Sequence, residues 1–187
     1  MKTTLLLLLL LGAIAARAHE SPIDHVEREL DLSVKDGQLC LGYRLHYTDR
    51  ALVMQLLAMD ANGDGKLNDE ERAAYFTDFA QKLADSFSVQ VDGKSVKFKP
   101  VGSMHPDGRL GQTYDFAAPL GALTPGRHPG SLLDGYSREY PGPYRLHQPD
   151  PGAAAHTHIE PLDQAPSADP NQHPAWLELK FAIVVPE

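Results

Sequence analysis

The chain has 187 residues and a formal charge of −8 at pH 7, with 25 acidic and 17 basic side chains. A surface this acidic repels phosphate backbones and anionic membranes and attracts cations, which makes nucleic acid a poor candidate partner. The single cysteine, Cys40, cannot form an internal disulfide, so a packed core or a bound metal ion must stabilise the fold.

The first eighteen residues are typical of a secretory signal peptide. Lys2 supplies a positive charge, an apolar run extends from Leu5 to Ala16, and Ala-Arg-Ala forms a small-x-small cleavage site. The run is shorter than the roughly 18 residues that a membrane-spanning helix needs, so we expect export and cleavage and not an anchor. Without Lys2 and Arg17 the mature chain, which begins at His19, has a formal charge of −10 and belongs in the periplasm or outside the cell.

Two alternating segments joined by an Asp-Gly turn predict a β-hairpin. Apolar side chains alternate with polar, mainly acidic ones from Val26 to Val34, and apolar or tyrosine side chains occupy every second position from Leu39 to Tyr47. A period of two with one polar face is the pattern of a half-buried strand. The turn would lie in "KDGQ", residues 35–38.

Helical signals follow on both sides of one polar loop. Thr48 or Asp49 can cap a short first helix. Its apolar stripe would consist of Leu52, Leu56 and Met59. A longer second helix has acidic residues in its first turn, where they suit the positive end of the helix dipole. Its apolar positions, at helical spacing, are Tyr75, Phe76, Phe79 and Leu83.

The loop itself, "DANGDGKLNDEE" at residues 60–71, matches a calcium-binding loop. Calcium takes roughly six to eight oxygen ligands, and such a loop supplies them from positions 1, 3, 5, 7, 9 and 12. Those positions are Asp60, Asn62, Asp64, Lys66, Asn68 and Glu71. Lys66 would contribute only its backbone carbonyl, Asn68 its amide oxygen or a water, and Glu71 both carboxylate oxygens. Gly65 stands where the chain must turn sharply; the alternative is a plain polar turn between two helices.

This loop is the mark of the EF-hand family, and residues 49–83 resemble one EF-hand helix-loop-helix unit. The family usually pairs two such units, but the chain contains no second loop of this kind. The resemblance implies Ca²⁺ binding, and the missing second unit favours a mainly structural site over a cooperative switch. We expect an affinity near the ~10⁻⁴–10⁻³ M of extracellular calcium modules.

The second half of the chain combines weaker and stronger strand signals. A second hairpin is predicted from Val89 to Phe98 with its turn in "DGKS", and one more strand near residues 112–117. Residues 148–175 have the composition of a flexible Pro/Gly-rich excursion. The last segment predicts a strong strand, with one face made of Leu177, Leu179, Phe181, Ile183 and Val185.

These elements predict one α+β domain over residues 19–187. We expect a mainly antiparallel, sandwich-like β domain with the EF-hand inserted between the two hairpins. The mature chain has no second long apolar run, so we expect no membrane span in it. The absence of Gly-x-Ser-x-Gly, His-Glu-x-x-His and phosphate-loop motifs gives no reason to expect an enzyme.

Histidines suggest a second metal chemistry, because imidazole is the commonest transition-metal ligand. The nine are His19, His25, His46, His105, His128, His147, His156, His158 and His173. "HTH" at 156–158 and the new amino terminus at His19 are the best candidates for nickel, cobalt or copper. The alternative is that loop histidines are solvated polar residues, since no spacing forms a defined set of three or four ligands.

The order of segments also resembles a larger architecture. "DHVERELDLSV", "LGYRLHYT", the single EF-hand loop and "VQVDGKSVKFKP" follow each other in an order similar to that of the extracytoplasmic soluble head that precedes the membrane helices of some bacterial nickel/cobalt transporter-like proteins. The resemblance covers roughly residues 18–100. It implies a periplasmic setting, a β-sheet with an inserted EF-hand and a link to metal handling, but not transport.

The sequence therefore favours a secreted or periplasmic calcium-binding module. Two alternatives stay open: a transition-metal-binding protein that uses the loop histidines, and a calcium-dependent interaction module with an unknown protein partner.

Overall fold

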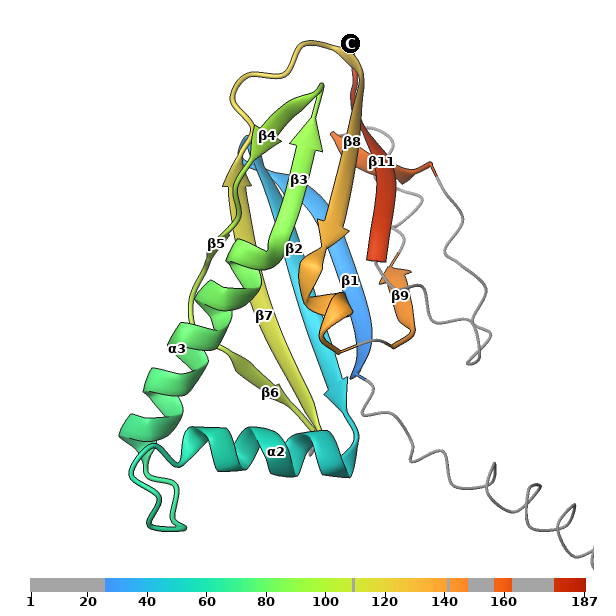
Figure 1. Ribbon diagram of the computed structural model, residues 1–187. Coiled ribbons are helices and arrows are strands. Elements are labelled where there is room, and N and C mark those ends of the chain that lie inside the picture. The colour runs from blue at the N-terminus through green and yellow to red at the C-terminus, as the bar shows by residue number, and fades with distance from the viewer. Residues whose placement is uncertain (1–25, 109, 141, 148–156, 163–176) are drawn as a thin grey trace, which may run out of the picture.

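The computed structural model describes residues 26–108, 110–140, 142–147, 157–162 and 177–187. Most of the described chain is β-strand, with two α-helices and one 3₁₀ helix (Figure 1). The elements in chain order are β1 (Val26–Lys35), β2 (Gln38–Tyr47), α2 (Asp49–Met59), α3 (Asp69–Ser86), β3 (Phe87–Val91), β4 (Lys94–Val96), β5 (Lys99–Pro100), β6 (His105–Asp107), β7 (Gly111–Pro119), β8 (Gly126–Asp134), the 3₁₀ helix η2 (Gly135–Arg138), β9 (Tyr144–His147), β10 (His158–Pro161) and β11 (Leu177–Val185).

The first sheet contains the first predicted hairpin. Its strands run in the order β5-β7-β2-β1-β9, and β6 also pairs with β7. All of these pairs are antiparallel except β1 with β9. The β1–β2 turn is Asp36-Gly37, both with positive φ (50° and 71°), which is the left-handed backbone that a two-residue hairpin turn requires.

The second sheet has the order β10-β11-β8-β3-β4 and is antiparallel throughout. Its β3–β4 hairpin, predicted from the sequence, turns at Asp92-Gly93 with φ of 51° and 71°. The predicted final strand is β11, and its central side chains Leu179, Phe181 and Ile183 are all buried. The mainly antiparallel, β-rich character predicted from the sequence is therefore confirmed.

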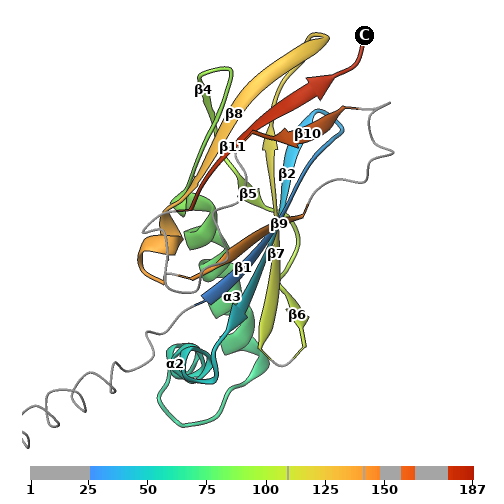
Figure 2. The same cartoon turned by 90° about the vertical axis from the view of Figure 1, so that its right-hand side faces the viewer.

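The two sheets share one hydrophobic core. Leu30, Leu41 and Tyr43 of the first sheet and Leu132 and Phe181 of the second are fully buried in the same cluster. Figure 2 shows the two layers in profile, with β8 and β11 in one and β2 and β7 in the other. Each fully buried side chain of this size contributes about 1.5–3 kcal/mol relative to exposure, so this shared core is the main favourable term of the fold.

A charged network lies inside this core, and the alternation of β1 did not reveal it. Arg28 occupies an inward position of β1 and is 1% exposed. Its guanidinium Nε lies 3.2 Å from Asp134 Oδ2 and 2.9 Å from the Tyr43 hydroxyl, which donates to the same carboxylate oxygen at 2.6 Å. Burial raises the pKa of Asp134, and Arg28 opposes that shift. The network links β1, β2 and the end of β8.

The two helices lie between β2 and β3, as the sequence predicted. On α3 the structure buries Phe79, Ala80, Leu83 and Ala84. On α2 the predicted stripe is correct at Met59, which is buried, but wrong at Leu56, which is 40% exposed, and Leu52 is only half-buried. The other buried positions of α2 are Ala51 and Gln55. The buried face of α2 therefore includes a side-chain amide, described below, at a position where burial was not expected from the sequence.

Several strands of the second half are longer or more numerous than the sequence indicated. The strand expected near residues 112–117 extends over all of β7, and β8 has no alternating signal because it contains Gly126, Pro129 and Gly130. A Cβ at Gly130 would collide with the ring of Phe181, so the core itself requires glycine there.

The predicted flexible excursion at 148–175 includes β10, which pairs with β11 and buries Ile159 to 2% exposure. Burial of Ile159 stabilises the ordered conformation of this part of the excursion. Residues 148–156 and 163–175 fall outside the described residues. Within the described chain no helix has the length and apolarity needed to cross a membrane.

Candidate metal centre

The loop of residues 60–68 is held between the end of α2 and the start of α3, at the far end of the molecule from the β3–β4 turn (Figure 1). Thr48 caps the start of α2, its hydroxyl accepting from Ala51 N at 3.2 Å. The residue that caps the end of α2 is Asp60, whose backbone N–H donates to the Leu56 carbonyl at 3.3 Å. Asn68 caps α3. Both ends of the loop are therefore fixed by regular helical structure.

Asp60, the first residue of the loop, is turned into its interior. Its Oδ1 accepts the backbone N–H groups of Gly63 at 2.9 Å and Asp64 at 3.1 Å. Its Oδ2 accepts the N–H of Gly65 at 2.8 Å. Three inward N–H groups partly neutralise this carboxylate, which keeps an acidic side chain in the middle of a tight loop.

Asn62 and Asp64 repeat the same local motif two residues apart. The amide oxygen of Asn62 accepts from Asp64 N at 2.8 Å, and Asp64 Oδ1 accepts from Lys66 N at 2.8 Å. Gly65 follows with φ of 76°, a conformation that is strained for any residue with a side chain. The three oxygen-bearing side chains at positions 1, 3 and 5 thus all fold back on the loop.

Asn68 and Glu71 form a capping box. Asn68 Oδ1 accepts from Glu71 N at 2.9 Å, and Glu71 Oε2 accepts from Asn68 N at 3.2 Å. The other carboxylate oxygen, Glu71 Oε1, is buried and has no hydrogen-bond partner within the described chain. A buried carboxylate oxygen without a partner carries a desolvation cost of about 1–3 kcal/mol or more, and it calls for an explanation.

Lys66, the remaining predicted position, and its neighbour Leu67 behave differently. The Lys66 side chain is exposed, which fits a residue expected to offer only its carbonyl. Leu67, the apolar position of the loop, is half-buried. Its carbonyl accepts from Arg72 Nη2 at 3.3 Å, which ties the loop to the first turn of α3.

The acidic side chains of the loop are not drawn together as a ready ligand set. Within the described residues no group of three or more His, Cys, Asp or Glu side chains is arranged to hold a metal ion. Half of the predicted set consists of other donors, the side-chain amide oxygens of Asn62 and Asn68 and the backbone carbonyl of Lys66. Three carboxylates also repel one another, so their approach depends on a bound cation.

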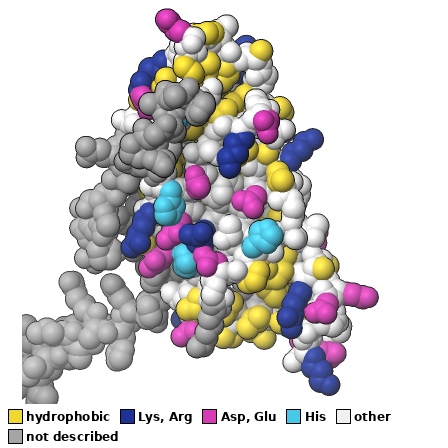
Figure 3. Space-filling model, turned by 180° about the vertical axis from the view of Figure 1, so that it is seen from behind, with side chains coloured by type: hydrophobic (Ala, Val, Ile, Leu, Met, Phe, Trp, Pro, Cys, Tyr) yellow, Lys and Arg dark blue, Asp and Glu magenta, His cyan; other side chains and the backbone are white. Residues whose placement is uncertain are grey.

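The histidines are dispersed, and most of the described ones pair with a carboxylate. His46 and His147 flank Glu29 on the outer face of the first sheet, at 3.9 and 3.3 Å, where Figure 3 shows histidines among acidic and basic side chains. Burial raises the pKa of Glu29, but hydrogen bonds from Arg44 and His147 outweigh it and hold that pKa below its usual value.

The other described histidines lie elsewhere. His128 pairs with Asp92 at 2.7 Å, and His158 lies 3.5 Å from Glu160. His105 is exposed on β6. The remaining candidates, His19, His25, His156 and His173, fall outside the described residues. Cys40 lies in β2 and is a free thiol.

Sequence reasoning missed a polar network under α2. The side-chain amides of Gln55 and Gln112 pair reciprocally, with N–O distances of 3.2 and 2.6 Å. Gln55 also donates to the Tyr47 hydroxyl at 3.2 Å, and the Tyr114 hydroxyl donates to Gln112 Oε1 at 2.8 Å. The sequence signal was one glutamine within the apolar run that follows Arg50 in α2.

No family model, no curated protein and no solved structure matches this chain.

Proposed function

We propose that the loop of residues 60–71 binds one Ca²⁺ ion as an EF-hand-like site, and that the ion acts mainly as a structural brace in an exported protein. The observation that carries this proposal is Glu71 Oε1, a buried carboxylate oxygen with no hydrogen-bond partner among the described residues. At the last position of the loop, this oxygen is one that a calcium ion would take as a ligand.

The donor set fits a hard cation. Asp60, Asn62 and Asp64 already fold into the loop and keep lone pairs that their backbone hydrogen bonds do not use. Asn68 is engaged as a helix cap, which favours the water-mediated contribution expected for its position. Calcium supplies positive charge that offsets the repulsion among Asp60, Asp64 and Glu71.

The ion would stabilise the junction between the two helices. The loop fixes where α3 begins, and α3 buries Phe79 and Leu83 in the core that the sheets share. A sheet-anchored α3 thereby takes the supporting role that a second EF-hand has in paired units. At concentrations a few-fold to a hundredfold above Kd, binding to the folded state alone contributes about 1–3 kcal/mol.

Calorimetric titration with calcium tests the proposal, with three variants alongside the parent chain. The parent should bind one ion at submillimolar to millimolar concentration. Asp60→Ala and Glu71→Gln should lose binding, because each removes a predicted ligand. Glu70→Gln is the matched control: it removes the same charge from the neighbouring exposed residue and should bind normally. Absence of a binding heat up to several millimolar calcium, or undiminished binding by Glu71→Gln, would contradict the site.

The same titration with nickel, cobalt and copper addresses the alternative based on histidines. That alternative requires binding that persists in Asp60→Ala and disappears when His19, His156 and His158 are replaced. We favour calcium because the oxygen donors of the loop are organised by seven hydrogen bonds within it. A binding role, and not catalysis, is the function that these residues support best.

A further inference from the structure

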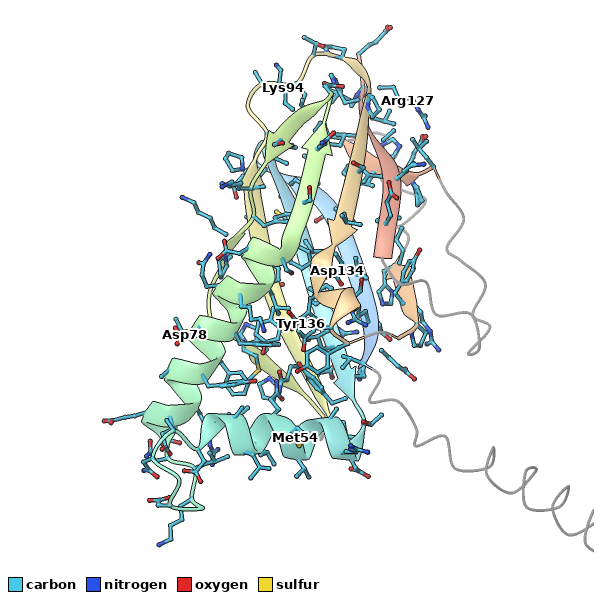
Figure 4. All side chains as sticks on the ribbon, viewed as in Figure 1. Met54, Asp78, Lys94, Arg127, Asp134 and Tyr136 are labelled. Carbon is cyan, nitrogen blue, oxygen red and sulfur yellow. The ribbon has the colours of Figure 1, made fainter. Side chains whose placement is uncertain are left out.

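A cavity separate from the loop lies between the two helices and η2. Its volume is about 580 Å³, which falls within the range of small-molecule sites. Each helix presents one stripe to it, at helical spacings of three and four residues. On α2 the stripe is Ala51, Met54, Gln55 and Ala58, and on α3 it is Tyr75, Asp78, Phe79 and Lys82. Figure 4 labels Met54, Asp78 and Tyr136, one from each side of this space.

Aromatic rings dominate the wall of the cavity. Phe79 stands at the centre, with its ring centroid 5.7 Å from that of Tyr75 and 5.6 Å from that of Tyr136. Tyr140 extends the group, 5.0 Å from Tyr136, and Tyr47 adds a further ring from β2. Aromatic faces carry negative electrostatic potential, so a cluster of them attracts a cation that has lost its water.

One ring of this group already interacts with a cation. The Arg28 guanidinium carbon lies 5.6 Å from the centroid of Tyr136. The charge of Arg28 is balanced by Asp134, 3.2 Å away, so it adds little repulsion to a second cation in the cavity. Burial raises the pKa values of Tyr47 and Tyr136, which keeps both hydroxyls neutral at physiological pH.

Two charged side chains of α3 lie at the mouth of the cavity, and only the positive one is paired with a described side chain of opposite charge. Lys82 is engaged by Glu139, with Nζ 3.2 Å from Oε2. Asp78 is exposed and lines the cavity, and no described side chain hydrogen-bonds to it or forms an ion pair with it. The formal charge of the whole chain, −8, adds long-range attraction for cations.

We propose that this cavity binds a small organic cation, an ammonium group joined to an apolar or aromatic body. The body would pack against the more exposed rings of Tyr75 and Tyr140, which the buried rings of Phe79 and Tyr136 support from below. The ammonium group would lie at the mouth near Asp78. The proposal goes beyond calcium binding, because none of the calcium-loop residues lines the cavity.

The test is a calorimetric titration with phenethylamine and with 2-phenylethanol, which differ in the amine and the hydroxyl on the same carbon skeleton. Phenethylamine should bind about tenfold more tightly, because only the amine carries a positive charge that Asp78 and the neighbouring aromatic rings attract. Both titrations are run in EDTA and again in millimolar calcium, because the proposed ion would stabilise the junction between the two helices that line the cavity. Binding of phenethylamine in either buffer supports the cavity site, whether or not the loop itself binds calcium. No saturable binding of phenethylamine, or equal affinity for the alcohol, would overturn the proposal.

Variants at the mouth identify the groups involved. Asp78→Asn should weaken phenethylamine binding several-fold and leave the alcohol unchanged. Asp85→Asn, the same change on the same helix but away from the cavity, is the control and should have no effect. Tyr140→Leu should weaken binding and Tyr140→Phe should preserve it, because the ring and not the hydroxyl is required. Tyr140 is 38% exposed, so these variants should fold, as thermal unfolding would verify. An equal loss in Asp85→Asn and Asp78→Asn would count against the site.

Discussion

The two helices on either side of the loop are attached to the β domain in different ways. α3 is amphipathic and has a capping box, and its Leu83 is completely buried in the shared core. α2 is apolar on almost all sides, yet Val53, Met54 and Leu57 are more than half exposed while Gln55 is buried. An amphipathic pattern specifies which face is buried, whereas an apolar helix leaves that choice to its surroundings.

The largest expected effect is the loss of stability on truncating the buried Leu83 of α3, compared with the same truncation of the exposed Leu57 of α2. Leu83→Ala should cost about 2–5 kcal/mol of unfolding free energy, because it leaves a cavity in the core. Leu57→Ala, at a position that is 64% exposed, should change stability by no more than about 0.5 kcal/mol. Urea unfolding of both variants measures the difference. Similar losses in the two would show that α2 is covered in solution and that the contrast between the helices does not hold.

A second prediction concerns the amide pair that orients α2. Gln55→Leu should cost about 1–3 kcal/mol, because it leaves the Gln112 amide buried without its partner. Adding Gln112→Leu should recover part of that loss, because both polar groups are then absent. A double-mutant cycle by urea unfolding gives the coupling energy. Additive losses would mean that the pair does not determine which face of α2 is buried.

The helix caps provide a smaller comparison. Thr48→Ala removes the α2 cap and should cost about 0.5–2 kcal/mol, equally in calcium and in EDTA. Asn68→Ala removes a cap of the same kind and, under the proposed function, also weakens the calcium site. Its cost should therefore be greater in calcium than in EDTA. Thermal unfolding in both buffers measures the loss of stability in each variant. Equal losses for Asn68→Ala in calcium and in EDTA would show that Asn68 does not contribute to calcium binding.

The smallest expected effect is a change in the pH dependence of stability at His128, at the opposite end of the molecule from the calcium loop. Because this site is distant from the loop, it serves as a control for the predictions made on the helices. Hydrogen bonds from His128 to the Thr124 carbonyl and to Asp92 raise the pKa of His128 above its usual value. A raised folded-state pKa contributes stability that is complete below the unfolded pKa of about 6.5 and is lost as pH rises through the folded value. The parent chain should therefore be more stable to unfolding than His128→Gln by about 0.2–1 kcal/mol at pH 6, the size typical of a surface pair. This difference in unfolding free energy should shrink between pH 6 and pH 9. Calcium affinity should not differ between the two proteins, and a changed affinity would show that this end and the loop are coupled.

Local spacing was enough to predict the elements whose contacts stay close in sequence. The Asp-Gly turns and the burial of Phe79 and Leu83 on α3 depend on residues a few positions apart. The hydrogen bonds inside the loop likewise join near neighbours, although the sequence predicted a ligand set there and not those bonds. Asp60, for example, reaches no farther than Gly65 within the loop. β8 was not predictable in this way, because Gly130 is in a strand only to make room for Phe181, 51 positions later in the chain.

The sequence by itself determined the two hairpins and the presence of α3, because backbone geometry sets the distance between near neighbours. Only the tertiary structure decided which face of α2 is buried, that Arg28 meets Asp134 inside the core, and that Tyr47, Tyr75 and Tyr136 line one cavity. Those contacts depend on strand register and on the packing of two sheets, and they join residues whose separation along the chain carries no periodic signal.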